Sequence, residues 1–457
     1  MLGGVLVALL PMLWLWGFTV DDALISARVA VNIASGTGYR FNYGGPVVDA
    51  VTPLGWAYLL APFAHEGVIA TWQAARLISA GAWLLAAGWL GVQMLGVASR
   101  WRAAPLLALG TCAPVAAWAA SGMETGCVLL LTTLALARRW WAPWVAGLAA
   151  AWRPELVPWA VVLALGSTVV QKRTPLHLLG ALVAALGPPA LMAAIRQGVF
   201  GSATPLSAMA KPSDLAHGWR YMISAVLLSG PPILLLAPRA VWRISGHAVA
   251  IVTAFMVHLL ALVMVGGDWM ALFRLLVPVL PGLLLVAAEI AAHSSFWPNL
   301  GRHLLAVGVG ALLSYDPGTR ARGVWKDRLA LMNAARPWVS ASQNVASVDI
   351  GWLGAVCPGR VTDLAGVTDP SVAAMPGGHT SKRIPRQFLA ARKVQLLLLL
   401  TQRDTQKTPW WERQFRGRVE ARLASYAKEQ GYELRGSLPL GKTQKEYLVL
   451  EAPDRRP

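Results

Sequence analysis

Two adjacent carboxylates, Asp21 and Asp22, directly follow an almost uncharged run of apolar residues at positions 1–18. A charged side chain at bilayer depth costs about 2.5–3.5 kcal/mol, and less near the surface. We therefore expect the pair to lie at a membrane boundary or in a wet cavity. Arg28 and Asn32 follow at helical spacing, which favours a functional site over two aspartates that only cap the next helix.

Two further motifs place charged residues where apolar segments begin or break. In SGMETG, Glu124 stands at an expected helix start, where a capping box with Ser121 is favoured over a functional role. In WRPE, Arg153 and Glu155 flank a proline that interrupts an apolar stretch. An ion pair between them and a role in a site remain alternatives.

Two outer loops add cations. GSATPLSAMAK ends at Lys211, although a lone lysine at an interface usually extends its ammonium group toward water. GGDWMALFR sets Asp268 and Arg274 at the mouth of an apolar segment, where an arginine is costly unless it meets an anion. Carboxylates that deprotonate a hydroxyl, worth about 10²–10⁴-fold in rate, and cations that stabilise a departing phosphate together fit a transferase with a lipid-phosphate donor.

The composition is that of a membrane protein with many spans. The 457 residues are 56% hydrophobic and 14% charged, whereas soluble domains carry about 25% charged residues. The net charge of +18 and the 22 Trp residues fit membrane lipid better than nucleic acid, because most basic residues lie between apolar runs or in the C-terminal quarter. The three Cys and eight His form no disulfide framework or metal motif.

Apolar periodicity predicts an all-α polytopic domain at 1–313 with eleven transmembrane helices. The basic loops fall on one side, which the positive-inside rule makes cytoplasmic; they include Arg138, Arg139, Lys172, Arg173, Arg239 and Arg243. The acidic motifs then face outward from the inner membrane, beginning with an outer loop at 19–67. The expected spans are 2–18, 68–97, 103–121, 124–137, 142–152, 155–170, 176–195, 219–237, 247–265, 271–291 and 303–313.

The tail at 314–457 is a different kind of sequence. Short apolar runs such as NVASVDIG, RVTDLAGV and EYLVLEA alternate with helical patterns. VQLLLLL is too short to cross a membrane and predicts a buried strand. We expect a small α/β domain on the outer, periplasmic face.

The ordered motifs resemble the GT-C fold glycosyltransferases, in the branch that includes the terminal β-arabinofuranosyltransferase of the mycobacterial cell wall. The resemblance extends from the first loop into the tail. It rests on DDALISARVAVNIASGTGYRFN, DAVTPLGWAYLLA, SGMETGCVLLL, WRPELV, FGSATPLSAMAK, GGDWMALFRLLVPVLP and VDIGWLGAVCPGRVTDLAGVTDP. It implies a sugar transferred from a polyprenyl-phosphate donor to an envelope glycan or glycolipid. Arabinofuranose is the favoured sugar, and a hexose stays open.

The resemblance also implies site residues. The catalytic acid of the first outer loop corresponds to Asp21 or Asp22; Asp21 is favoured as the base that directs an inverting displacement, with Asp22 in support. A divalent cation such as Mg²⁺ or Mn²⁺ beside the pair is an open alternative, because arginine and lysine can also help phosphate to leave. The cavity lining would include Arg28, Asn42, Glu124, Arg153, Lys211, Asp268 and Arg274.

Two other classes of function compete with the transferase. A transporter or flippase of a lipid-linked sugar also needs a charged cavity, but its binding groups usually lie near the bilayer midplane within internal repeats. No repeat is visible in this sequence. An assembly factor with an outer binding domain accounts for the tail, but not for charged residues at the ends of so many apolar segments.

Overall fold

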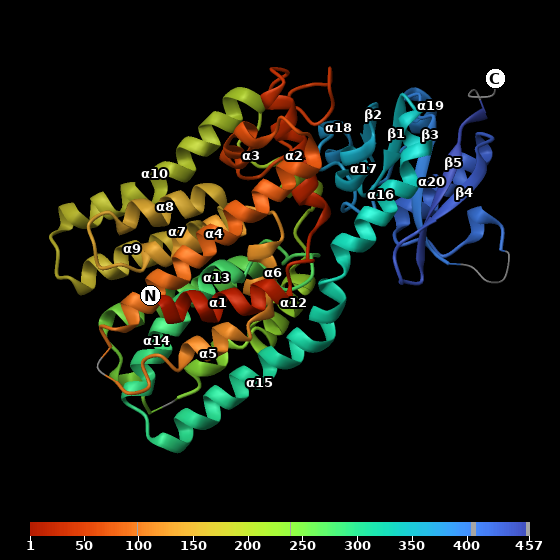
Figure 1. Cartoon of the computed structure of the whole chain (residues 1–457). Helices are drawn as coiled ribbons and strands as arrows, with labels where there is room; N and C mark the ends of the chain where they lie inside the picture. Colours follow the sequence, from red (N-terminus) through yellow and green to blue (C-terminus); the bar gives the residue numbers. More distant parts are fainter. Residues whose placement is uncertain (98, 238, 404–407, 454–457) are drawn as a thin grey trace. The chain divides into compact units, whose positions relative to one another are not determined.

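The computed structural model describes residues 1–97, 99–237, 239–403 and 408–453. It is mostly helical and carries a small sheet near the C-terminus (Figure 1). The chain forms two compact units, each built from three segments. Unit 1 comprises Met1–Thr19, Ala75–Ile195 and Ser213–Gly323; unit 2 comprises Val20–Ala74, Arg196–Pro212 and the chain from Val324 onward.

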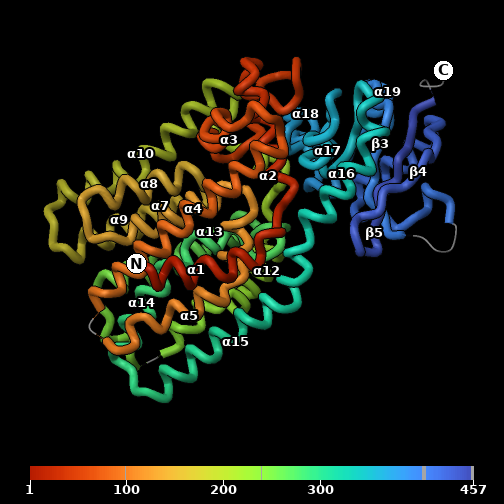
Figure 2. Tube along the Cα trace, viewed as in Figure 1, coloured from red at the N-terminus to blue at the C-terminus, as the bar shows by residue number. Residues whose placement is uncertain are grey.

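Unit 1 is a bundle of apolar helices, whose course can be followed along the Cα trace (Figure 2). It also holds most of α4 (Val68–Met94) and α10 (Pro175–Phe200). The expected boundary at residue 314 falls inside a continuous helix, α15. The other helices are α1 (Leu2–Trp14), α5 (Pro105–Gly110), α6 (Ala113–Ala120), α7 (Thr125–Ala135), α8 (Ala142–Trp152), α9 (Val157–Val170), α12 (Leu215–Leu228), α13 (Gly246–Met264), α14 (Leu280–Ala292) and α15 (Phe296–Ala321).

Three helices of the described chain are long and apolar enough to cross a membrane, namely α4, α10 and α13. The expectation of eleven transmembrane helices is therefore not supported. Several other apolar helices, among them α1, α7 and α8, have only 10–17 residues. A helix that crosses the hydrocarbon layer without tilt or distortion of the bilayer needs about 20 residues.

Proline and glycine account for much of this difference. The expected span at 103–121 is divided between α5 and α6, and α6 begins with a proline in its first turn. The expected span at 219–237 ends early because Gly230 has a φ of 90° and two prolines follow it in a 3₁₀ turn, Pro231–Leu235. Hydropathy alone does not register these interruptions, since proline lacks an amide donor and glycine accepts a left-handed conformation.

Close helix packing in unit 1 depends on small residues. At Gly126 in α7, a Cβ atom would overlap the backbone carbonyl oxygen of Ser79 in α4. The Gly126 N–H also donates to Ser79 Oγ at 3.0 Å. The absence of a side chain at Gly126 therefore lets the backbones of α7 and α4 lie in direct contact.

We predict that Gly126→Ala lowers the melting temperature of the purified protein, because overpacking of this kind usually costs about 1–3 kcal/mol. Gly81→Ala is the matched control, because a Cβ atom at Gly81, in α4, would have no other atom within 4 Å. That control should be neutral or slightly stabilising. Equal melting temperatures for the two variants would contradict the packing described for Gly126.

Unit 2 contains the sheet and the helices around it. Parallel pairing joins β1 to β2 and to β3, and antiparallel pairing joins β3 to β5 and β5 to β4, in the order β2-β1-β3-β5-β4. The strands are β1 (Asn344–Ser347), β2 (Arg360–Asp363), β3 (Leu396–Gln402), β4 (Glu433–Pro439) and β5 (Lys445–Glu451). The helices are α2 (Asp21–Ala34), α3 (Leu54–Leu60), α11 (Leu206–Ala210), α16 (Val324–Ser340), α17 (Ile350–Val356), α18 (Pro370–Ala373), α19 (Phe388–Ala391) and α20 (Arg418–Glu429).

The sheet confirms the predicted small α/β fold of the tail. The VQLLLLL run forms the central strand β3, which is buried along all but its last residue. A strand covered on both faces reads as a continuous apolar run. α17 packs against β1 and β2 and α20 against β3 (Figure 1), and Leu397, Leu399 and Leu423 lie together in one core.

Candidate functional site

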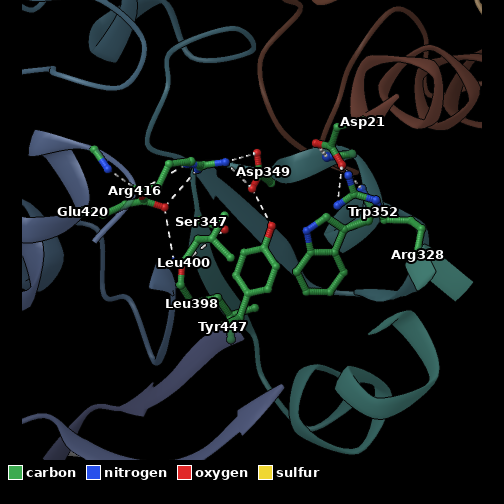
Figure 3. A network of polar contacts seen from close by, with 12 residues as sticks. Asp21, Arg328, Ser347, Asp349, Trp352, Leu398, Leu400, Arg416, Glu420 and Tyr447 are labelled. Carbon is green, nitrogen blue, oxygen red and sulfur yellow. Dashed lines mark hydrogen bonds and ion pairs between the residues drawn. The ribbon is translucent and has the colours of Figure 1, made fainter. Parts of the chain in front are cut away.

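Asp21 is the first residue of α2, but its carboxylate does not cap that helix. Oδ2 accepts the Gly351 N–H at 2.6 Å and Oδ1 accepts the Trp352 N–H at 2.9 Å (Figure 3). These amides lie in the first turn of α17, whose own N-cap residue, Asp349, makes no side-chain cap. The aspartate pair was expected to cap the next helix in sequence or form a site; Asp21 caps a helix more than 300 residues away.

Arg28 holds the opposite end of α17. Its guanidinium donates to Gly354 O at 2.6 Å and to Cys357 O at 3.1 Å. Asp21 and Arg28 are seven residues apart, and α17 is seven residues long. The two helices therefore run parallel, with a carboxylate at the positive end of the α17 dipole and a guanidinium at its negative end.

Arg28 is fully engaged by protein oxygens. It also donates to Phe41 O at 2.8 Å, to Gly359 O at 3.2 Å and to Asn42 Oδ1 at 3.4 Å. Burial lowers the pKa of Arg28 to about 10, so the group remains charged at neutral pH. These contacts give Arg28 a structural role, and we do not assign it to a phosphate.

Asn42 also acts on the tail domain. Its side chain accepts the Val361 N–H at 2.9 Å and donates to Val361 O at 2.9 Å. It thus forms a two-bond clamp on strand β2. The sequence predicted that Asn42 lines a cavity, whereas the structure engages its amide with a strand.

Arg328, in α16, places a cation beside Asp21. Its Nη1 lies 3.8 Å from Asp21 Oδ1, and that buried nitrogen makes no hydrogen bond within the described chain. Burial raises the pKa of Asp21 to about 6, against the lowering effects of Arg328 and of the two α17 amides. A carboxyl group with this pKa is well suited to accept a proton near neutral pH.

A second ion network lies next to Asp21. Asp349 accepts two hydrogen bonds from Arg416 Nη1, at 2.9 and 2.7 Å, and one from the Tyr447 hydroxyl (Figure 3). Although burial opposes it, the pKa of Asp349 falls below its usual value because Arg416 and Arg328 favour the anion. Arg416 also pairs with Glu420 at 2.9 Å. This network fixes the N-terminus of α17 against β5 and α20.

Two other predicted site residues lie in unit 2. Asp22 follows Asp21 in the first turn of α2 and is half-buried. Lys211 is half-buried directly after α11, a helix that packs on α18. The Leu206 N–H at the start of α11 donates to Asp49 Oδ2 at 3.3 Å, and Asp49 also pairs with Arg196 at 3.0 Å.

The remaining predicted site residues lie in unit 1, where three of them form a triad in which Glu124 and Arg153 are buried and Glu155 is partly exposed. Arg153 pairs with Glu124 at 3.1 Å and with Glu155 at 3.1 Å. The ion pair expected from WRPE is present, but the capping box expected from SGMETG is not: α7 begins at Thr125, and Ser121 Oγ instead accepts the Met123 N–H. Two carboxylates against one guanidinium leave a formal excess of one negative charge.

Asp268 and Arg274 pair at 2.8 Å in an irregular segment between α13 and α14. Leu272 and Phe273 have positive φ values of 61° and 53°, which is uncommon for large side chains. Trp118 Nε1 donates to Leu272 O at 2.9 Å and holds this conformation. The structure thus pairs Arg274 with an aspartate of its own loop and places its guanidinium over the Trp118 ring, 5.5 Å from the centroid.

The metal left open by the sequence is a poor fit to the aspartate pair. Both oxygens of Asp21 already accept backbone amides and face a guanidinium. Among the residues described, no three His, Cys, Asp or Glu side chains gather in a group that could bind a metal ion. We therefore derive no step through a metal.

Sequence reasoning missed the partners that the tail supplies to Asp21. Arg328 and Asp349 were not singled out, because α16 and α17 are distant from Asp21 in the chain. The one available signal was the VDIGWLG stretch, in which an aspartate directly after a strand is followed by two glycines, Gly351 and Gly354. A Cβ at Gly351 would overlap the Asp21 backbone, and one at Gly354 would lie 2.9 Å from Arg28 Cδ.

Neither a protein-family model nor a curated protein sequence matches the chain.

We predict that Asp21→Asn speeds amide exchange across 350–356 at least about tenfold, because each hydrogen bond to a charged group contributes about 1.5–3 kcal/mol. The measurement is hydrogen–deuterium exchange of the full chain, followed by mass spectrometry. Glu429→Gln is the control, since its ion pair with Arg386 is exposed on both sides and should contribute little. Unchanged protection at 350–356 in Asp21→Asn would exclude the capping role.

Proposed function

We propose that the protein is an integral membrane glycosyltransferase of the GT-C type that moves a sugar from a polyprenyl-phosphate donor to an envelope glycan or glycolipid. The inner membrane is the proposed location, with the catalytic carboxylates and the α/β domain on the outer face. The three long apolar helices and the motif order of the sequence support this proposal. Arabinofuranose is the favoured sugar.

The observation that carries the proposal is the pairing of Asp21 with Arg328. A base of pKa about 6 stands 3.8 Å from a guanidinium nitrogen. That nitrogen is buried and makes no hydrogen bond within the described chain, and a buried donor without a hydrogen-bond partner supports a role toward a ligand. Glycosyl transfer from a phosphate donor needs a proton acceptor and a cation close together.

The proposed step is a single displacement. Asp21 takes the proton of the acceptor hydroxyl while that oxygen attacks the anomeric carbon of the sugar. The bond from that carbon to the phosphate oxygen breaks, and its electron pair leaves with the polyprenyl phosphate. Arg328 stabilises the negative charge on the departing phosphate, and the anomeric configuration inverts.

Asp21 can combine this role with its hold on α17. A carboxylate offers about four lone-pair positions, and the two backbone amides of α17 use two of them. Those amides fix the orientation of the carboxylate, which is what a general base requires. Asp22 is the alternative base, at the same end of α2.

The rate of sugar transfer should rise with pH through about 6 and then level off, because Asp21 accepts a proton only when it is ionised. Initial rates of the purified protein with a polyprenyl-phosphate arabinofuranose donor test this between about pH 5 and 8. Asp21→Asn should lower the rate at least about 100-fold and remove the rising limb. A slower variant that keeps the rising limb would assign Asp21 to positioning and make Asp22 the base.

Two variants of Arg328 distinguish the effect of its charge on kcat from the effect of its packing. Arg328→Gln is expected to lower kcat by about 100-fold or more, since it removes the cation that faces the leaving group. Arg328→Lys should recover part of kcat because it restores the charge. Arg386→Gln, at an exposed ion pair of the same unit, is the matched control and should leave the rate unchanged. Wild-type kcat in Arg328→Gln would remove this residue from the mechanism.

A further inference from the structure

A cavity of about 450 Å³ opens in unit 1 among α7, α8, α9 and α10. α8 packs against α7 and α9, while α9 and α10 meet through Ala164, Ala181 and Ala185. The two loops at one end of these helices form its mouth. The cavity lies entirely within this unit and shares no residue with the site at Asp21.

The inner walls of the cavity are mostly apolar and consist largely of small side chains, with Ser167 and Thr168 as polar exceptions. Ala146, Leu163 and Ala184 line the interior. Gly180, in α10, also lines the cavity, and a Cβ atom at this position would have no other atom within 4 Å. Small residues here leave room that larger side chains would fill. A hydrocarbon chain gains about 0.8 kcal/mol for each CH₂ group that it buries against such a surface.

The mouth is basic. Arg139 and Arg173 line it together with His177, and both arginines are exposed. No acidic residue lines the cavity, and neither arginine has a carboxylate partner in the described part of the chain. Each of the two loops carries a pair of basic residues, Arg138 and Arg139 in one and Lys172 and Arg173 in the other, and the positive-inside rule favours the cytoplasmic side for such loops.

The surroundings match a lipid environment. Most residues of α10 are not buried by the rest of the protein. Leu176 and Leu179, for example, are 75% and 58% exposed. Trp140 and Trp144 flank the mouth, at 83% and 47% exposure. Tryptophan is enriched where the hydrocarbon layer meets the headgroups.

We infer that this cavity binds an anionic glycerophospholipid, with an acyl chain between α8 and α10 and the headgroup phosphate between Arg139 and Arg173. Basic pockets between membrane helices on the cytoplasmic side are suited to such headgroups. The site is separate from the proposed transfer of a sugar and stands whether or not that proposal holds.

The test uses native mass spectrometry of the purified full chain, titrated with dioleoylphosphatidylglycerol and with dioleoylphosphatidylcholine. The wild type should bind the anionic lipid at least about tenfold more tightly. Arg139→Gln/Arg173→Gln should weaken phosphatidylglycerol binding about thirtyfold. Arg239→Gln/Arg243→Gln carries the same change of charge in another loop of unit 1, away from the cavity lining, and should stay within about twofold of the wild type.

A second pair of variants tests the apolar part without changing charge. Gly180→Leu adds a large side chain at a residue that lines the cavity and should weaken phosphatidylglycerol binding by competing for the space of the acyl chain. Gly198→Leu is its control in α10. A Cβ atom at Gly198 would also have no other atom within 4 Å, but Gly198 does not line the cavity. Equal melting temperatures for the two variants would show that the folds are matched.

Three results would overturn the inference. Equal affinity for the two lipids would remove the role of the basic mouth, and unchanged binding in Arg139→Gln/Arg173→Gln would place the lipid elsewhere. Displacement of phosphatidylglycerol by an equimolar polyprenyl phosphate would assign the cavity to a different occupant. Sugar transfer is measured separately, so failure here does not depend on the outcome of the rate assays.

Discussion

The organisation of unit 2 depends on how α2 holds α17 by both ends. Asp21 accepts the amides at the N-terminus of α17, and Arg28 donates to carbonyls at its C-terminus. The seven residues between the two charges match the seven residues of α17. Each charge thereby satisfies backbone groups that a helix end leaves unpaired, and each has the sign that the helix dipole favours. Gly351 and Gly354 make the contact possible, because any larger residue would separate the two helices.

This contact also determines the chemical state of Asp21. Burial between α2 and α17 raises the pKa of the carboxyl group, while Arg328 and the two amides keep the rise moderate, at about 6. At the neighbouring Asp349, burial also favours the neutral acid, but Arg416 and Arg328 outweigh it and lower the pKa. The two aspartates of this network thus differ in proton affinity because burial prevails at Asp21, whereas the two arginines prevail at Asp349. Such a separation is typical of sites in which one carboxyl group accepts protons and the other provides fixed charge.

The sequence predicted the elements better than the contacts between them. VQLLLLL was recognisable as a buried strand because a strand covered on both faces is continuously apolar, and the helix that begins at Asp21 was indicated by the helical spacing of Arg28 and Asn32. Arg28 and Asn42 were singled out as site residues, yet their partners, Gly354 and Val361, lie more than 300 residues away. No local pattern encodes such a partner. The number of spans was overestimated because hydropathy does not register breaks such as Gly230 and the prolines after it.

The central claim is that Asp21 serves in the transfer of a sugar from a polyprenyl phosphate. The most direct measurement is the composition of envelope glycans and lipid-linked sugars in a strain that lacks the gene, complemented with the wild type or with Asp21→Asn. If Asp21 is the base of the transferase, one sugar linkage disappears in the deletion strain, its polyprenyl-phosphate donor accumulates, and only the wild type restores the linkage. An unchanged glycan profile in the deletion strain would contradict the transferase, and full restoration by Asp21→Asn would contradict the role of Asp21.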